Sequence, residues 1–408
     1  MVANSAISPS PTVPPHLPSP ARRRVALALL TACVFVVGTA EWVMVGLLPG
    51  LSADLHQPIP VVGSLVTWYA LVVTVAGPLV TVLMLRVPRR TALLSLVAVF
   101  VASNVVAAVA GGFATLVAAR VVTALTHSTS FAVAVVIAVS MSPATSRGRA
   151  IAVVSTGWNL ATVLGAPLGT WVGDHFGWRT TFWGISVLSA LALAGIATLI
   201  PPSTSDAPSG VRAEVRALLD RRVAGVLAVA VVSFAGFYTL YTYIAPLLGD
   251  VSGFSASVVA TLLVVFGVGA LVGNAVGGRL ADSAPWPSLC AALAGLAAVL
   301  GVFAFTVHVQ WASAVTMFVL GAVLSAVPPL LQDRALAAAP AAPTLVTAVA
   351  ASAINLGIAG GSKLGGAALD AGSSLADLTW IGALVALLSV PLAAYTASRR
   401  ATPTTSEA

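Results

Sequence analysis

The sequence predicts an all-α membrane protein with twelve transmembrane helices in two pseudo-symmetric six-helix bundles. Of its 408 residues, 59% are hydrophobic and only 8% are charged, and the mean hydropathy is +1.02. A soluble protein of this length needs far more charged surface. Apolar stretches recur along the chain, each close to the roughly 20 residues that cross a bilayer as a helix. The alternation in segments of about 10 residues that is typical of a membrane β-barrel is absent.

Prolines, glycines and charge clusters mark the expected helix ends. Residues 1–22 are proline-rich and are predicted to form a disordered cytoplasmic tail, and the apolar segment that follows is too long for a signal-peptide core. The first bundle, residues 23–200, has expected helices at 25–48, 63–84, 91–110, 113–140, 149–171 and 180–200. A polar cytoplasmic linker covers 201–222. The second bundle, residues 223–398, has expected helices at 223–248, 257–278, 287–307, 309–331, 344–366 and 378–397, and residues 399–408 form a second tail.

The basic residues orient these helices. With the N-terminus inside, 16 of the 19 lysines and arginines fall in cytoplasmic segments. The exceptions are Arg179 in an external loop, and Arg120 and Lys363 within spans. This bias predicts that both termini are cytoplasmic. The net charge of +7 is therefore explained by membrane topology, and nucleic-acid binding is not expected.

The two halves also share a faint internal similarity. The second expected helix ends GPLVTVLMLRVPRR and the eighth ends GNAVGGRLADSAP, so each is a glycine-containing helix that runs into a basic cytoplasmic turn. Two parallel repeats related by an axis along the membrane normal are typical of a secondary transporter.

Glycines in the fifth expected helix lie on one face. In GWNLATVLGAPLGTWVG, Gly157, Gly165, Gly169 and Gly173 are spaced by 8, 4 and 4 residues, with Pro167 among them. Such spacing aligns them along a helix. The segment resembles the fifth-helix motif of major-facilitator antiporters. GWRTTFW (177–183) resembles the start of their sixth helix, and AARVVTALTHSTSF (118–131) resembles their fourth-helix arginine motif. The second copy of their cytoplasmic loop motif is similar to GGRLAD, with Gly278, Arg279 and Asp282.

Together with TAEWVMVGLLPGLSADL (39–55) and NLGIAGGSKLGG (355–366), these segments make residues 22–400 resemble the 12-span drug:proton antiporter family of the major facilitator superfamily. Within it, the sequence is most similar to the bacterial sugar-efflux and chloramphenicol-efflux branch. The resemblance implies a multi-pass protein of the bacterial plasma membrane that exports a compound in exchange for protons. The first cytoplasmic loop, LRVPRR, departs from the family motif because it lacks the aspartate.

Three ionisable residues inside the expected spans are candidates for proton coupling: Glu41, Arg120 and His127. A charge at the bilayer centre costs roughly 2.5–3.5 kcal/mol, so it indicates a function. At the rise of an α-helix, Glu41 lies roughly 12 Å and Arg120 roughly 10 Å from the outer helix ends. We hypothesise that Glu41 carries the coupling proton and is tuned by Arg120, with His127 nearby. The alternatives are a static buried pair that fixes helix packing, and a hydrogen-bonded packing role for His127. Lys363 can extend its charge to the interface instead.

Polar and aromatic residues of other spans are candidates for a substrate cavity. Tyr238, Tyr241 and Thr242 share a helix face, although an interfacial aromatic belt is an alternative. Tyr69, Asn159 and Asn355 are further candidates, or else they hold helices together. These residues favour a small neutral or amphiphilic solute, and the family resemblance implies a drug such as a chloramphenicol-like antibiotic. A sugar or nucleoside, or an uncoupled facilitator, is the alternative.

Several classes of function are not expected from the sequence. It contains no nucleotide-binding loop, zinc-type spacing or nucleophilic constellation. We therefore expect no catalytic residues, no metal and no cofactor, with the proton as coupling ion. The expected partners are the solute, protons and the lipid bilayer, and the chain is expected to act as a monomer.

Overall fold

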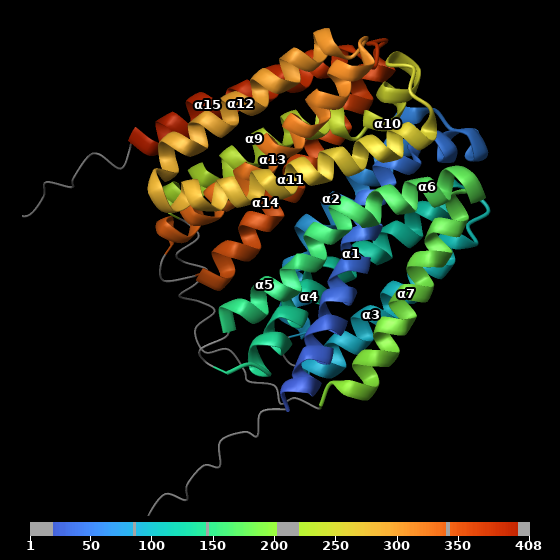
Figure 1. Ribbon diagram of the computed structural model, residues 1–408, viewed down its shortest axis with the longest axis vertical. Coiled ribbons are helices and arrows are strands. Elements are labelled where there is room, and N and C mark those ends of the chain that lie inside the picture. Colours follow the sequence, from blue (N-terminus) through green and yellow to red (C-terminus); the bar gives the residue numbers. More distant parts are fainter. Residues whose placement is uncertain (1–18, 85–86, 144–146, 202–219, 340–342, 399–408) are drawn as a thin grey trace, which may run out of the picture.

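The computed structural model describes residues 19–84, 87–143, 147–201, 220–339 and 343–398, and its regular structure there is helical throughout (Figure 1). The first half contains α1 (Pro20–Leu55), α2 (Ile59–Met84), α3 (Arg89–Ala108), α4 (Phe113–Ser140), α5 (Arg147–Leu160), the π-helical segment η2 (Ala161–Gly165), α6 (Ala166–Phe176) and α7 (Trp178–Leu199). The second half contains α9 (Arg221–Tyr241), α10 (Ile244–Pro246), the π-helical segment η3 (Leu247–Val251), α11 (Ala256–Ser283), α12 (Pro285–Thr306), α13 (Gln310–Ala338), α14 (Pro343–Asp370) and α15 (Asp377–Ser398).

Ten of the described helices are long and apolar enough to cross a membrane. They correspond to ten of the twelve expected spans, and most begin or end within a few residues of the expected positions. The fifth and eleventh expected spans, at 149–171 and 344–366, are also helical but are not among these ten. The prediction of an all-helical membrane protein is therefore confirmed.

Two expected helices depart from regular α-helix near a proline. Pro167 cannot donate a hydrogen bond to the residue four positions before it. The backbone before it widens into η2, where the Ala166 N–H bonds the Ala161 carbonyl instead. The helix expected at 223–248 ends at Tyr241 and, after a turn at Thr242 and Tyr243, continues as α10, which contains Pro246 and leads into η3.

Other differences concern the helix termini and the linker. The tail predicted at 1–22 is too long by three residues, because α1 begins at Pro20 with Ser19 as its N-cap. Asp220, at the end of the predicted linker, caps α9 through the Arg222 N–H at 2.8 Å. Residues 202–219 of the linker, residues 1–18 and the tail at 399–408 lie outside the described ranges.

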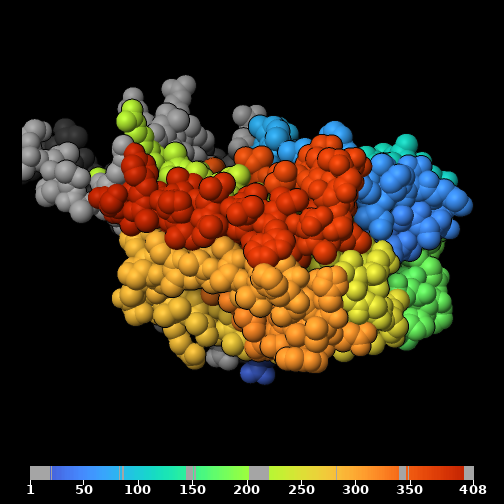
Figure 2. Space-filling model, turned by 90° about the horizontal axis from the view of Figure 1, so that it is seen from above, coloured from blue at the N-terminus to red at the C-terminus, as the bar shows by residue number. Residues whose placement is uncertain are grey.

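The helices of each half pack mainly against one another, and the halves meet at one end. Figure 1 shows α1–α7 on one side and α9–α15 on the other. The two groups converge near α10 and α6 and lie farther apart toward the end of α7 and the start of α9. Seen from above, the blue and green atoms of the first half lie beside the yellow to red atoms of the second (Figure 2). The contacts across the halves join α2 to α14, α1 to α10, and α11 to α6 and η2.

The outward faces of the helices are apolar. Leu191 on α7, Phe305 on α12 and Leu384 on α15 expose 64%, 71% and 63% of their surface. Buried polar side chains such as Asn104 and Ser233 lie inside. A lipid solvent explains this arrangement, because it leaves no hydrophobic cost for exposed leucine and favours polar groups in the interior.

Candidate functional site

A cavity of about 290 Å³ lies between the two halves. The first half contributes Glu41 from α1 and Asn159 from α5, and the second half contributes Tyr238 from α9, Asn274 from α11 and Asn355 from α14. The lining is mostly aromatic and aliphatic, with these few polar groups among it. Such a composition is typical of a site for a small organic molecule.

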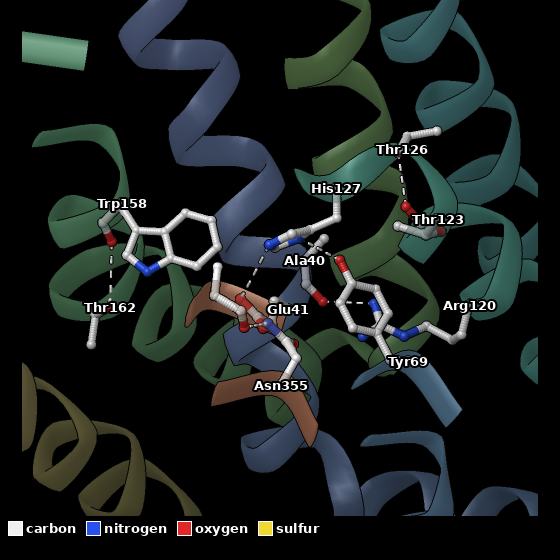
Figure 3. Close-up of polar contacts among 11 residues, drawn as sticks. Ala40, Glu41, Tyr69, Arg120, Thr123, Thr126, His127, Trp158, Thr162 and Asn355 are labelled. Carbon is white, nitrogen blue, oxygen red and sulfur yellow. Dashed lines mark hydrogen bonds and ion pairs between the residues drawn. The ribbon is translucent and has the colours of Figure 1, made fainter. Parts of the chain in front are cut away.

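Glu41 is the acidic residue of this lining. Its side chain is 14% exposed, and its Oε2 atom has no hydrogen-bond partner among the described residues. The nearest cationic candidate is His127, whose Nε2 lies 3.9 Å from Oε2. Figure 3 shows Glu41 between His127 and Asn355, at the point where the two halves face each other. A buried carboxyl group with a free oxygen can take up a proton or accept a hydrogen bond from a solute.

Arg120 lies close to Glu41 but does not pair with it directly. Its guanidinium donates to the carbonyl oxygen of Ala40 at 2.6 Å, and its Cζ lies 4.2 Å from the ring centroid of Tyr69. The ion pairs of the described residues do not include Glu41–Arg120. Both side chains instead line a narrow pocket that adjoins the cavity. The described residues therefore show Glu41 and Arg120 as neighbours without a direct ion pair in this conformation.

His127 and Tyr69 form a buried pair next to Glu41. The Tyr69 hydroxyl and His127 Nδ1 are 2.8 Å apart, and the two rings meet edge to face with centroids 5.7 Å apart. Trp158 packs edge to face on the other side of the imidazole at 5.1 Å. Tyr69, expected in the substrate cavity, thus belongs to the group formed by Glu41, Arg120 and His127.

The remaining cavity candidates divide into two groups. Asn159, Tyr238 and Asn355 line the cavity. Tyr241 and Thr242 do not: Tyr241 stacks on Phe237 in the core, and Thr242 is fully buried. The interfacial belt is not what the structure shows, because both tyrosines are buried.

Two tryptophans of the cavity were missed from the sequence. Trp42 follows Glu41 and lies near Tyr238, with ring centroids 6.4 Å apart. Trp158 lies in the fifth-helix motif, one residue after its first glycine. The sequence offered one indication of these tryptophans, because each is the direct neighbour of a residue that was selected as a candidate. Sequence spacing alone does not say which of them turns inward.

The glycine face of the fifth helix packs on α1, the helix that carries Glu41. A Cβ on Gly165 would overlap the side chain of Thr39, and one on Gly169 would lie 2.6 Å from Val43 Cγ2. Gly157 and Gly173 similarly contact α1, and Pro167 lies between them, buried in α6. The aligned glycines therefore let two helices approach closely, as expected from their spacing.

Comparison with known proteins identifies the family. Residues 30–362 match the model of the Major Facilitator Superfamily. The chain belongs to this superfamily. Among its relatives, the inner membrane transport protein YdhP of Escherichia coli (strain K12) is 34% identical over 92% of this chain and 96% of its own. The chloramphenicol resistance protein of Streptomyces lividans is 33% identical over 90% and 94%. The crystal structure of a D-xylose–proton symporter has a TM-score of 0.74, at 16% identity over 91% and 97%. The chain is therefore a major-facilitator transporter with efflux-related relatives.

In the GGRLAD loop motif (277–282), the glycine that makes the close helix contact is not the one selected from the sequence. Gly278 has open space around it, and Arg279 is exposed. The close contact is made by Gly277, where a Cβ would lie 2.7 Å from Ala326 Cα on α13. The side chain of Asp282 is not among those that the structure describes.

Neither Lys363 nor a metal-binding group contributes to the cavity in the described residues. Lys363 is exposed on α14 and does not line the cavity. Among the described residues, no three histidine, cysteine, aspartate or glutamate side chains gather as a metal site.

Proposed function

We propose that this transporter exports a small neutral or amphiphilic compound, such as a chloramphenicol-like antibiotic, in exchange for protons. The observation that carries the proposal is the Glu41 carboxyl group. It lies in a cavity shared by both halves, and its Oε2 has no hydrogen-bond partner among the described residues. An ionisable group placed inside a transporter is expected to serve its ion or solute pathway.

The cavity lining supports an aromatic or amphiphilic solute. Trp42, Trp158, Phe234, Tyr238 and Phe266 offer flat surfaces within it. Aromatic faces gain contact area at little conformational cost, and a few amides fix the orientation of the solute. The similarity to the chloramphenicol resistance protein agrees with a solute of this kind.

The contacts between the halves support alternating access. At the end away from the linker, Tyr243 of the second half lies between α2 and α14, where its hydroxyl donates to the Ser362 carbonyl at 3.2 Å. Ser362 donates in turn to the Gly63 carbonyl at 3.3 Å. Because this end is packed while the halves separate at the other, a rocking motion would open it and close the opposite end.

The proposal includes a membrane topology. We infer twelve spans, with α5–η2–α6 and α14 as the two added to the ten found by length and hydropathy. Both termini face the cytoplasm and the protein resides in the bacterial plasma membrane as a monomer. Protons are the coupling ion, and no cofactor is required.

Transport measurements with Glu41→Gln test the function. The wild-type chain and the variant are expressed in an efflux-deficient bacterium and compared for growth on a panel that includes chloramphenicol and sugars. Purified proteins are then reconstituted, and uptake of a compound found in the panel is measured with an imposed pH gradient, with and without a protonophore. Asp377→Asn, which changes a carboxyl group at the start of α15 that does not line the cavity, is the matched control.

The expected result is export that requires the pH gradient and is lost in Glu41→Gln but kept in Asp377→Asn. Undiminished proton-driven export by Glu41→Gln would contradict the assignment. Tolerance to every compound equal to that of cells without the protein would contradict the efflux function.

A sugar or nucleoside is the second candidate solute. The observation that favours it is the group of three cavity amides, Asn159, Asn274 and Asn355, which can bind several hydroxyl groups. Tolerance to a growth-inhibiting sugar or nucleoside in the same panel, without tolerance to chloramphenicol, would select this candidate. Transport that persists with protonophore present would instead indicate an uncoupled facilitator.

A further inference from the structure

The buried tyrosine next to the proposed coupling site has no role in the function described so far. Tyr69 on α2 is 2% exposed and does not line the larger cavity. Its hydroxyl contacts His127 Nδ1 at 2.8 Å, and the other nitrogen of the same imidazole, Nε2, lies 3.9 Å from Glu41 Oε2. The imidazole therefore stands between a phenol and a carboxyl group (Figure 3).

We propose that Tyr69 is a positioning residue that anchors His127 through Nδ1, so that Nε2 faces Glu41 and carries its N–H when Glu41 is ionised. This inference rests on the proposed proton coupling and deepens it, because it assigns a tautomer to His127 and a reason for that tautomer. A neutral imidazole carries one N–H, and the partner of one nitrogen decides what the other nitrogen presents.

The hydrogen-bonding capacities of the three groups select the tautomer. An ionised carboxylate only accepts hydrogen bonds, so the nitrogen facing it is favourably an N–H. Nδ1 is then an acceptor, and the Tyr69 hydroxyl donates to it. A protonated Glu41 reverses the arrangement: its O–H faces a bare Nε2, and Nδ1–H is donated to the Tyr69 oxygen. The tyrosine hydroxyl serves both states because it can donate and accept.

Neighbouring side chains fix the position of this pair. Arg120 lies 4.2 Å from the Tyr69 ring centroid, on the face of the ring. Trp158 covers the imidazole at 5.1 Å with its ring plane nearly perpendicular, at 86°. These contacts leave the hydroxyl as the hydrogen-bonding group that orients the imidazole.

Few other titratable side chains among the described residues lie around Glu41 and His127. The titratable or charged side chains around Glu41 and His127 are Arg120 on α4, Tyr69 on α2 and Tyr238 on α9. α5 contributes Trp158 and Asn159, which do not titrate. Loss of the Tyr69 hydroxyl would therefore be felt mainly through His127.

The first measurement does not depend on transport. Protein labelled with ¹⁵N-histidine is studied in nanodiscs by NMR, and the His127 signals are assigned by their disappearance in His127→Gln. We expect the Nε2–H tautomer in wild-type protein above the pH at which Glu41 loses its proton. Tyr69→Phe removes the group that binds Nδ1, so the imidazole is no longer held in one orientation and a mixture of the two tautomers is expected. A wild-type Nδ1–H tautomer under these conditions, or a spectrum unchanged by Tyr69→Phe, would overturn the proposal.

The second measurement is the pH profile of chloramphenicol transport in proteoliposomes. Tyr69→Phe releases His127 from its position 3.9 Å from the carboxyl group, so the pH of half-maximal transport is expected to rise by about half a unit or less, because Nε2 and Oε2 are beyond hydrogen-bond distance. Tyr395→Phe, on the exposed face of α15, controls for removal of a phenol hydroxyl. In the His127→Gln background, Tyr69→Phe should cause no further shift. An equal shift in that background would show that Tyr69 does not act through His127.

The two measurements separate this inference from the proposed function. If the NMR spectra show the expected tautomers but transport ignores the pH gradient, proton coupling fails and the positioning role of Tyr69 stands. If transport is proton-driven but the tautomer does not respond to Tyr69→Phe, the positioning role fails and the coupling stands. Size-exclusion profiles of Tyr69→Phe confirm that the variant folds.

Discussion

Gly360 and Gly361 are adjacent in α14, yet the structure gives them opposite surroundings. Gly360 is exposed, and a Cβ built on it would meet nothing within 4 Å. Gly361 is buried against α9, where a Cβ would overlap the carbonyl oxygen of Ala235 and lie 2.9 Å from its carbonyl carbon. Alanine substitutions at the two positions are therefore expected to change stability in opposite directions.

The size of each effect follows from two terms. Alanine is favoured over glycine in a helix by about 1 kcal/mol, and Gly360→Ala is expected to gain up to this amount. Gly361→Ala gains the same term but overpacks the α9–α14 contact, which costs about 1–3 kcal/mol. The upper part of this range applies because the obstacle is backbone, which cannot rotate away as a side chain can. The net expected effect is a destabilisation of about 1–2 kcal/mol.

Thermal unfolding in detergent measures the difference. Intrinsic tryptophan fluorescence of the purified variants should give a higher apparent Tm for Gly360→Ala and a lower one for Gly361→Ala, relative to wild-type protein. Ala235→Gly should not rescue Gly361→Ala, because the obstructing atom belongs to the main chain. Shifts of the same sign in both variants would refute the close approach of α9 and α14.

Three further outcomes are expected. Gly165→Ala should lower the apparent Tm. Thr39→Ala should recover part of the loss, because it removes the nearest obstacle, the hydroxyl oxygen, while Thr39 Cβ stays 2.9 Å from the added Cβ. An additive double variant would contradict this contact. Arg179→Lys should lower the apparent Tm only slightly, since its ion pair is half exposed and worth about 1 kcal/mol or less; a large loss in the same melt would contradict that estimate. Gly63→Ala should displace the Tyr243 ring, whose hydroxyl lies 2.6 Å from the added Cβ. Transport should then slow without loss of folding, and an unchanged rate would show that this contact does not limit the cycle.

The candidate site shows where sequence reasoning stopped. Glu41, Arg120 and His127 could be selected because ionisable residues stand out within apolar spans, and helix rise placed Glu41 and Arg120 at similar depth. Helix rise does not give the angle at which side chains meet. Arg120 therefore turned out to bind the Ala40 carbonyl, and Tyr69 to join His127.

The sequence by itself determined the all-helical membrane architecture, most helix ends and the glycine face of the fifth helix, because hydropathy, proline and residue spacing act locally along the chain. The tertiary structure alone decided which partners meet across helices. It placed Trp42 and Trp158 in the cavity, removed Thr242 from it and made Gly277 rather than Gly278 the close contact. Each of these depends on the rotation of one helix against another, which is set by packing between residues far apart in the sequence.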